Sequence, residues 1–306
     1  MSRVDLNIKK RKSCRLMLIT IHRDKATFVS LNRFEAKKNI ELALEAFSLG
    51  KKDRPDGSMR LVVAGMSLLQ TTTSNNSTDV PFCHHYTGGY DKALKDNIDT
   101  YARLAKLCDD SGLRYVTIRP EDGDSNPTST EVNKAEVVFL LNFTDGQRAS
   151  LLTADSSIAL LYTPENEHFG IVPVEAMACG LPVLGVNSGG PTETVVDTDA
   201  ELSGEGATGL LRRPEADQWA RAMSTLFDLS PDDRARIARA GKERVRKNFS
   251  SEKLGEEMEL ACYEAVSRGR VGLEEQCLLL VGALGLAWIM AAIAVLFSQI
   301  PASHSR

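Results

Sequence analysis

Two glutamates with seven residues between them, Glu167 and Glu175, stand around the predicted start of a short helix. Gly170 leaves room for a ligand at that start, and Pro173 suits an early helical position, where its missing N–H would be unpaired anyway. The free amides of a helix start bind anions, and carboxylates accept hydrogen bonds from neighbouring hydroxyls. The spacing therefore indicates a site for a small phosphate-bearing molecule with hydroxyls, such as a nucleotide sugar.

Three groups of polar residues and glycines follow predicted strands. Because the carboxyl ends of parallel strands share one edge of a sheet, we expect the groups to share one site. Taken singly, an acidic residue near a helix start or a basic loop is an ordinary solvated feature, and only their joint position favours a site. The groups are Arg33, Lys37 and Lys38; Glu165, Glu167 and His168; and Asn187, Ser188, Gly189 and Gly190.

The elements that must position these groups alternate between strand and helix. The predicted strands are Ala26–Phe34, Met59–Gly65, Arg114–Arg119, Glu136–Phe143, Ser157–Pro164, Leu181–Ser188 and Thr208–Arg213, the last at an edge. The predicted helices are Asn39–Gly50, Tyr90–Gly112, Thr144–Asp155, Phe169–Gly180, Pro191–Val196, Glu215–Leu229, Pro231–Asn248 and Ser251–Arg268. Continuous apolar strands predict a parallel sheet covered on both faces. We expect an α/β fold with a single doubly wound, Rossmann-like domain over residues 26–270.

Two further stretches are expected to lack regular structure. Residues 66–89 are polar, rich in Thr, Ser and Asn, and without periodicity, which predicts a disordered insertion. Residues 120–134 are expected to form a loop.

Composition excludes several classes of protein. A net charge of −4 gives no reason to expect nucleic acid as a partner. The six cysteines are scattered without CxxC spacing, which indicates reduced thiols and not a zinc site or a disulfide frame. Three short patterns imitate metal sites, at residues 83–85, 122–124 and 197–199, but the two Asp pairs lie in turn-rich loops and the first lacks a second ligand pair. No metal is expected.

The two ends of the chain differ in character. Residues 1–25 hold eight Lys or Arg against two acids, which predicts a frayed basic tail, with a nuclear signal or a contact to anionic lipid as the alternative. Residues 277–297 carry no charge over 21 positions. As a helix they would span about 30 Å, which predicts a transmembrane helix that anchors a cytosolic domain, with a buried hairpin helix as the alternative.

Three segments carry a resemblance to a known family. "SLNRFEAKKNIELALEAF", "VVAG…GGYD" and "LLYTPENEHFGIVPVEAMACGLPVLGVNSGGPTETV" resemble the retaining glycosyltransferases of family four, which have the GT-B fold. Within that family, "NEHFGIVPVEAM" followed by "VNSGGP" is most similar to mannosyltransferases of dolichol-linked oligosaccharide assembly. The resemblance covers roughly residues 28–249.

The resemblance implies roles for individual residues. Glu167 would be the catalytic residue that contacts the donor sugar, and Glu175 would contact the ribose. Arg33 and Lys38 would neutralise the donor diphosphate. The other residues expected to bind the donor are His168, Phe169, Gly170, Ile171, Ser188 and Gly189, with the backbone amides of Phe169, Gly170 and Ile171 touching phosphate or sugar.

The implied reaction transfers mannose from GDP-mannose to a dolichol-diphosphate-linked oligosaccharide with retention, forming alpha-1,3 and alpha-1,6 linkages without metal or cofactor. The expected location is the endoplasmic reticulum membrane, with the catalytic domain in the cytosol and other mannosyltransferases of the pathway as partners. The resemblance reaches only the donor-binding half of a GT-B enzyme, so the N-terminal acceptor domain is expected to be missing. Two alternatives follow: an inactive, membrane-tethered module that binds nucleotide sugars, or another family-four transferase that uses a donor such as UDP-GlcNAc.

Overall fold

The computed structural model describes residues 25–54, 56–66, 90–119, 122, 125–199, 201–268, 281 and 284–290. These residues fall into two compact units, the first ending at Phe249 and the second beginning at Ser250. The first unit holds the sheet and the helices that cover it. The basic tail and the predicted insertion lie outside the described residues, apart from Lys25 and Met66 at their borders.

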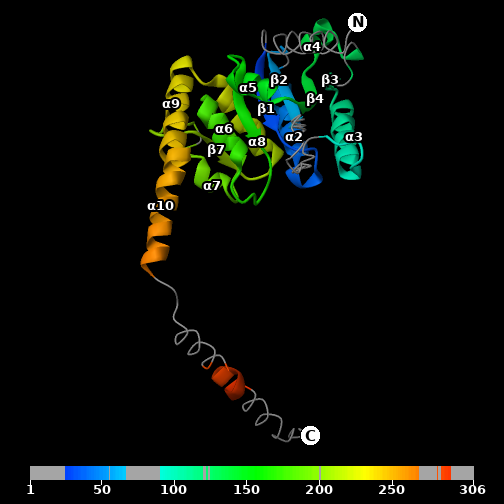
Figure 1. The fold of residues 1–306 in the computed structure, drawn as a ribbon. Coiled ribbons are helices and arrows are strands. Elements are labelled where there is room, and N and C mark those ends of the chain that lie inside the picture. The colour runs from blue at the N-terminus through cyan, green and yellow to red at the C-terminus, as the bar shows by residue number, and fades with distance from the viewer. Residues whose placement is uncertain are drawn as a thin grey trace, which may run out of the picture. The chain divides into compact units, whose positions relative to one another are not determined.

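The core of the first unit is a parallel sheet of seven strands in the order β3-β4-β2-β1-β5-β6-β7 (Figure 1). The strands are β1 (Ala26–Leu31), β2 (Met59–Met66), β3 (Tyr115–Ile118), β4 (Val137–Phe143), β5 (Ser157–Tyr162), β6 (Val183–Val186) and β7 (Gly209–Arg212). Every neighbouring pair is parallel. The predicted parallel α/β sheet is therefore confirmed, with β7 at an edge as expected.

Helices cover both faces of this sheet. They are the 3₁₀ helix η1 (Ala36–Lys38), α2 (Ile40–Lys52), α3 (Lys95–Asp110), α4 (Ser129–Lys134), α5 (Asp145–Thr153), α6 (Ile171–Cys179), α7 (Pro191–Thr194), α8 (Ala216–Asp228) and α9 (Pro231–Asn248). One apolar cluster joins Phe28 of β1 to Trp219 of α8, and the other joins Val29 of β1 to Met177 of α6. Adjacent residues of one strand thus point into two separate cores, because side chains alternate across a sheet. This arrangement explains why the strands are mostly apolar instead of alternating between apolar and polar residues.

Capping boxes fix the starts of two helices in this unit, α4 and α5. Thr144 caps α5: its hydroxyl accepts from the backbone N–H of Gln147, while the Gln147 side chain accepts from the backbone N–H of Thr144. Thr128 and Glu131 form the same motif at the start of α4. The prediction of a loop over residues 120–134 is therefore wrong at its end, where a reciprocal cap stabilises a six-residue helix.

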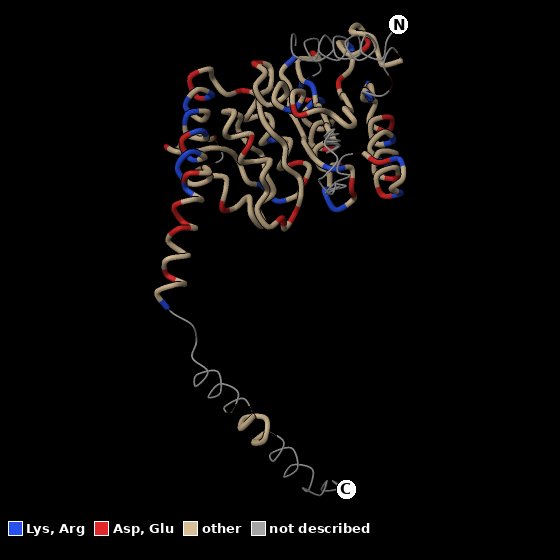
Figure 2. The backbone as a smooth tube through the Cα atoms, viewed as in Figure 1, with Lys and Arg blue, Asp and Glu red and all other residues tan. Residues whose placement is uncertain are grey.

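The second unit contains α10 (Ser251–Ser267), which begins at the N-cap Ser250. Acidic residues recur along this helix (Figure 2). Its large apolar side chains are all more than half exposed within the structure described: Leu254, Met258, Leu260, Tyr263 and Val266.

The prediction of a transmembrane helix over residues 277–297 is wrong for the structure as described. Within that segment the description covers Val281 and residues 284–290, both helical, and the rest lies outside it. Seven helical residues rise about 10 Å, far less than the roughly 30 Å of a bilayer core. Nowhere in the described part of the chain does a helix combine the length and the apolarity that crossing a membrane requires.

A buried carboxylate ties three elements together at the amino ends of the strands. Glu136, just before β4, is 3% exposed and pairs with Lys51 at the end of α2 at 2.6 Å. It also accepts from the backbone N–H of Arg114 at 2.9 Å and from the Arg114 guanidinium at 3.2 Å. Burial alone would raise the pKa of Glu136, but the hydrogen bonds from Lys51 and Arg114 outweigh it and hold the pKa below its usual range.

This carboxylate predicts a specific pH dependence of stability. A depressed pKa in the folded state stabilises the fold above the unfolded value of about 4.3, and that contribution is lost as the pH falls through the folded value. Glu136→Gln should lower the free energy of unfolding by about 1–3 kcal/mol at pH 7, and the difference should narrow below about pH 4. Urea unfolding of both forms across this pH range measures the effect.

The exposed Glu205 provides the matched control. Glu205→Gln should change the free energy of unfolding by less than about 0.5 kcal/mol at every pH of the series. A difference between Glu136→Gln and the unmodified chain that stays constant from pH 7 to pH 3 would contradict the assigned role.

Candidate functional site

The strand order reverses at the centre of the sheet. β1 and β5 are neighbours, yet the chain continues from β1 toward β2 on one side and from β5 toward β6 on the other (Figure 1). In open α/β sheets, ligands bind outside the carboxyl ends of the strands at such a reversal. The loops that follow β1, β5 and β6 are therefore the place to examine for chemistry, as the sequence predicted.

Lys38 and Glu167 meet across this reversal. Lys38 ends η1, which follows β1, and its ammonium group forms an ion pair with Oε1 of Glu167 in the loop after β5. The Lys38 side chain is 15% exposed and that of Glu167 is 32% exposed, so the pair is partly shielded from water. The hydroxyl of Thr163 donates to the carbonyl oxygen of Lys38 at 2.6 Å, which ties the two loops together. A cation and a carboxylate thus stand side by side at the reversal.

The other two predicted basic residues of this edge, Arg33 and Lys37, lie near Glu35 of their own loop. Arg33 follows β1 directly, and its side chain is 48% exposed and 3.7 Å from Glu35. Lys37 pairs with the same carboxylate at 3.2 Å and is 71% exposed. The structure thus brings Lys38 to the acidic loop, whereas Arg33 stays on the exposed side of its own loop. A role for Arg33 in binding a ligand stays a prediction.

The loop after β6 supports the backbone of the loop that carries Glu167. The amide of Gly190 donates to the carbonyl oxygen of Glu167 at 2.7 Å, and the amide of Asn166 donates to Oγ of Ser188 at 3.1 Å. A Cβ atom on Gly190 would lie 2.3 Å from the carbonyl oxygen of Phe169, and one on Gly189 would lie 2.4 Å from that of Glu167. Only glycine permits this approach, so the two loops pack backbone against backbone.

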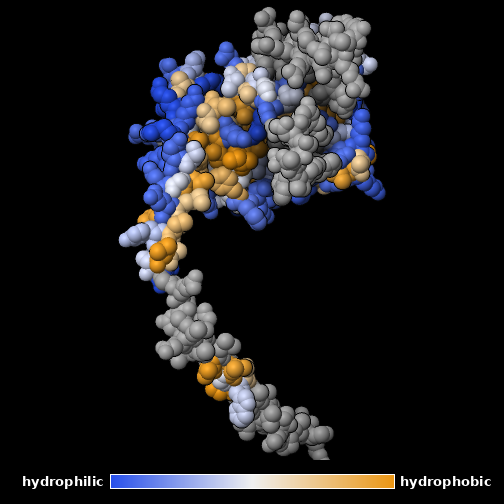
Figure 3. Space-filling model, in the orientation of Figure 1, coloured by the Kyte–Doolittle hydropathy of each residue, from blue (hydrophilic) through white to orange (hydrophobic). Residues whose placement is uncertain are grey.

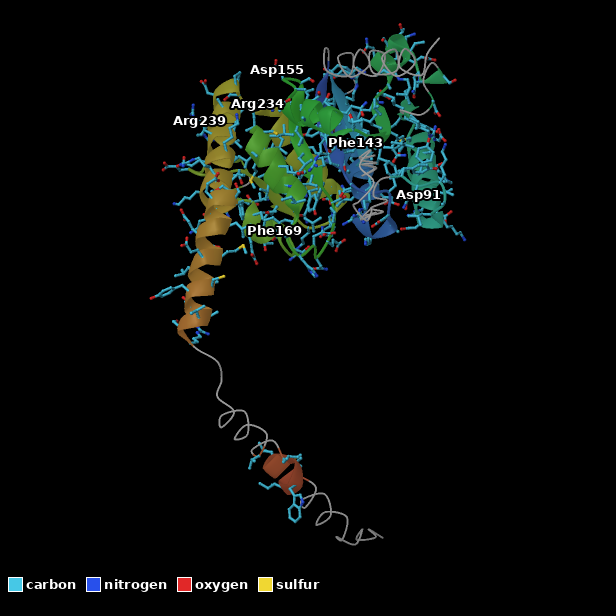
Figure 4. All side chains as sticks on the ribbon, viewed as in Figure 1. Asp91, Phe143, Asp155, Phe169, Arg234 and Arg239 are labelled. Carbon is cyan, nitrogen blue, oxygen red and sulfur yellow. The ribbon has the colours of Figure 1, made fainter. Side chains whose placement is uncertain are left out.

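The start of α6 is open toward this edge. Its N-cap residue, Gly170, has φ of 77° and offers no side chain to cap the first amides. His168 is exposed, Phe169 is 43% exposed and Ile171 is 56% exposed. Hydrophobic side chains gather over this part of the surface (Figure 3), and Phe169 lies beside α7 (Figure 4). A helix start with free amides next to Lys38 suits a bound anion.

Tyr162, the last residue of β5, is a neighbour of this site that the sequence did not single out. It is 4% exposed, and its hydroxyl oxygen would lie 3.3 Å from a Cβ placed on Gly170. Burial, with a smaller contribution from the charge of Glu167, raises the pKa of Tyr162. The hydroxyl therefore stays protonated at neutral pH and can donate a hydrogen bond. Its place at the carboxyl end of a central strand was the available signal.

Glu175 has an ion-pair partner of its own. It lies in the second turn of α6 and forms an ion pair with Arg148 of α5. Arg148 follows β4 by five residues, so examining the end of that strand would have revealed it as well. Each predicted carboxylate is therefore half of an ion pair, Lys38 with Glu167 and Arg148 with Glu175, and their contacts to a donor stay predictions.

Of the three patterns that imitate metal sites, the structure describes residues 197–199 in full. Asp197 pairs with Arg212 at 2.7 Å, and Asp199 accepts from the amides of the loop that follows it, which is the predicted turn chemistry. Residues 83–85, 123 and 124 lie outside the described residues. Elsewhere, over the ranges that the structure describes, no three His, Cys, Asp or Glu side chains gather in a way that could hold a metal ion.

Comparison with known proteins relates this site to a family. The family model for glycosyl transferases group 1 matches residues 126–244. An alpha-1,3/1,6-mannosyltransferase ALG2 from Rhizomucor pusillus is 34% identical over 270 residues, covering 86% of this chain and 51% of the relative. The ALG2 of Saccharomyces cerevisiae is 33% identical, covering 76% of this chain and 41% of the relative. The chain thus spans about half the length of the curated relatives it matches.

Solved structures agree on the fold. A glycosyltransferase from Rickettsia africae matches with a TM-score of 0.56 at 16% identity, covering 88% of this chain and 54% of that one. The C-terminal domain of a group 1 family glycosyl transferase from Francisella tularensis matches with a TM-score of 0.50 at 15% identity, covering 77% of this chain and 92% of that domain. The seven-stranded parallel sheet is therefore the Rossmann-like half of a GT-B fold. The family model and the relatives agree that the chain carries a glycosyl transferases group 1 domain.

Proposed function

We propose that this chain forms the donor-binding part of an enzyme that transfers mannose from GDP-mannose to a dolichol-diphosphate-linked oligosaccharide with retention. The observation that carries the proposal is the meeting of Lys38 and Glu167 at the reversal of the strand order, beside the open start of α6. The choice of mannose is supported by the alpha-1,3/1,6-mannosyltransferases among the relatives. The choice of GDP and dolichol is supported by the resemblance of residues 160–193 to the transferases of that pathway.

The charges of the site suit a nucleotide diphosphate sugar. In the proposed complex, the diphosphate takes Lys38 as its counterion and accepts from the amides at the start of α6. Glu167 then exchanges its ion pair for hydrogen bonds from the sugar hydroxyls. Arg33, exposed on the neighbouring loop, is within the same edge and adds positive charge toward the phosphates.

Catalysis in this proposal is mainly electrostatic. Breaking the bond between mannose and GDP places negative charge on the leaving diphosphate, and a preorganised cation and helix amides stabilise that charge more in the transition state than in the ground state. The protonated hydroxyl of Tyr162 is a further donor next to Gly170. The proposed acceptor is lipid-linked, so we place the reaction at the cytosolic side of the endoplasmic reticulum membrane, among other transferases of the pathway.

Titration calorimetry of the full chain with GDP-mannose and with UDP-GlcNAc tests the donor. We expect GDP-mannose to bind at least tenfold more tightly than UDP-GlcNAc. Preference for UDP-GlcNAc would reassign the chain to another sugar transferase of the same family. If neither donor binds at millimolar concentration, the proposed function is wrong for this chain.

Two neighbouring lysines allow a matched test of the cation. Lys38→Ala should weaken GDP binding by about tenfold to a hundredfold, because it removes a charged hydrogen bond and leaves Glu167 to repel the diphosphate. Lys37→Ala, which removes an exposed side chain paired only with the local Glu35, should stay within twofold. Calorimetric dissociation constants for the three forms provide the comparison, and equal losses for the two variants would contradict the assigned role of Lys38.

Gly190 tests the support of the acidic loop. Gly190→Ala places a Cβ against the carbonyl oxygen of Phe169, so the loop that carries Glu167 must shift, and GDP-mannose binding should fall at least tenfold. Gly50→Ala, in α2, meets its nearest backbone atom at 3.9 Å and should leave binding within twofold. Circular dichroism should show both variants folded. Unchanged binding by Gly190→Ala would mean that the loop does not set the donor site.

A further inference from the structure

Arg148 occupies a fixed position at the carboxyl end of β4. The capping box of Thr144 and Gln147 sets the start of α5, and the amide of Arg148 donates to the carbonyl oxygen of Thr144 at 2.9 Å. Arg148 is thus one helical turn from the cap, on a helix that packs beside α6 (Figure 1).

Glu175 reaches Arg148 from the second turn of α6. The guanidinium pairs with Oε2 of the carboxylate, and the Arg148 and Glu175 side chains are 18% and 31% exposed. Oε2 is itself buried, whereas the Glu175 side chain as a whole keeps 31% of its surface exposed. Arg148 therefore holds the buried oxygen of Glu175, while the rest of this side chain is partly exposed to solvent.

Holding one oxygen has a physical consequence for binding. A free glutamate has three side-chain torsions to order when it binds a ligand, whereas a glutamate held by an arginine fork has lost most of that freedom already. An arginine suits this task because its planar group donates in fixed directions. Burial lowers the pKa of Arg148, but the group remains charged at neutral pH.

We infer that Arg148 is a positioning residue for the donor site: it holds Oε2 of Glu175 so that Oε1 can accept a hydroxyl of the donor nucleotide. This inference rests on the proposed function, since it assumes that a nucleotide occupies this edge of the sheet. It assigns Arg148 no contact with the donor. Its effect on binding passes through Glu175.

A double-mutant cycle with GDP as the probe distinguishes the indirect role from a direct contact. Arg148→Met and Glu175→Gln should each weaken calorimetric GDP binding by about tenfold, and the double variant should lose no more than about twofold beyond either one. Arg148→Lys keeps the cation and should stay within about threefold of the unmodified chain. Losses that multiply in the double variant, or an equal loss for the Lys and Met variants, would overturn the inference.

Arg54→Met is the matched control. Arg54 forms a comparable, partly exposed ion pair with Asp228, away from the carboxyl ends of the strands. Its replacement should lower thermal stability as much as Arg148→Met does but leave GDP binding within twofold, whereas a tenfold loss of binding would show that any lost ion pair suffices and would overturn the inference. If the unmodified chain fails to bind GDP, the proposed function and this inference fall together. If it binds GDP and the cycle is additive, the inference alone is wrong.

Discussion

Parallel pairing throughout the sheet forces all seven strands to end at one edge, and the chemistry of this protein depends on that constraint. A parallel sheet must be covered on both faces, so the connections between strands are helices that begin at the same edge. Charged loops and open helix starts therefore gather there without any local sequence signal that they belong together. At the reversal between β1 and β5 the chain leaves toward opposite sides of the sheet, which is where ligands bind in open α/β sheets.

At this edge, residues of opposite charge form ion pairs. Lys38 and Glu167 pair across the reversal, and Arg148 of α5 pairs with Glu175 of α6. Each pair neutralises its own charges, which limits the cost of keeping partly buried charges in place. The glycines after β6 complete the arrangement by letting two backbones touch, so that the loop bearing Glu167 is supported along its length.

Much of this fold follows from the sequence because local patterns agree with the tertiary structure. Apolar runs marked every strand, and Thr144 marked the start of α5. The helix α4 was missed because its residues are polar and short of periodicity, although Thr128 and Glu131 spelled out a capping box. The predicted membrane helix rested on apolarity alone, a property of composition that does not guarantee a long helix.

The site was harder to read than the fold, and the partner of Glu175 shows why. Spacing placed Glu175 one and a half turns into a helix, but only the packing of α5 against α6 brings Arg148 to it. Contacts between helices depend on rotations that sequence spacing does not specify. Lys38 and Glu167 could be anticipated because both follow adjacent strands.

The backbone contact between the loops after β5 and β6 has a consequence for redesign. The contact that supports the loop of Glu167 is made by peptide groups, whose shape does not change when side chains are exchanged. Asn166 and His168, which flank Glu167 in the sequence, are exposed. A library that randomises these two positions while retaining both glycines would vary the exposed side chains beside Glu167 and preserve the backbone that carries them.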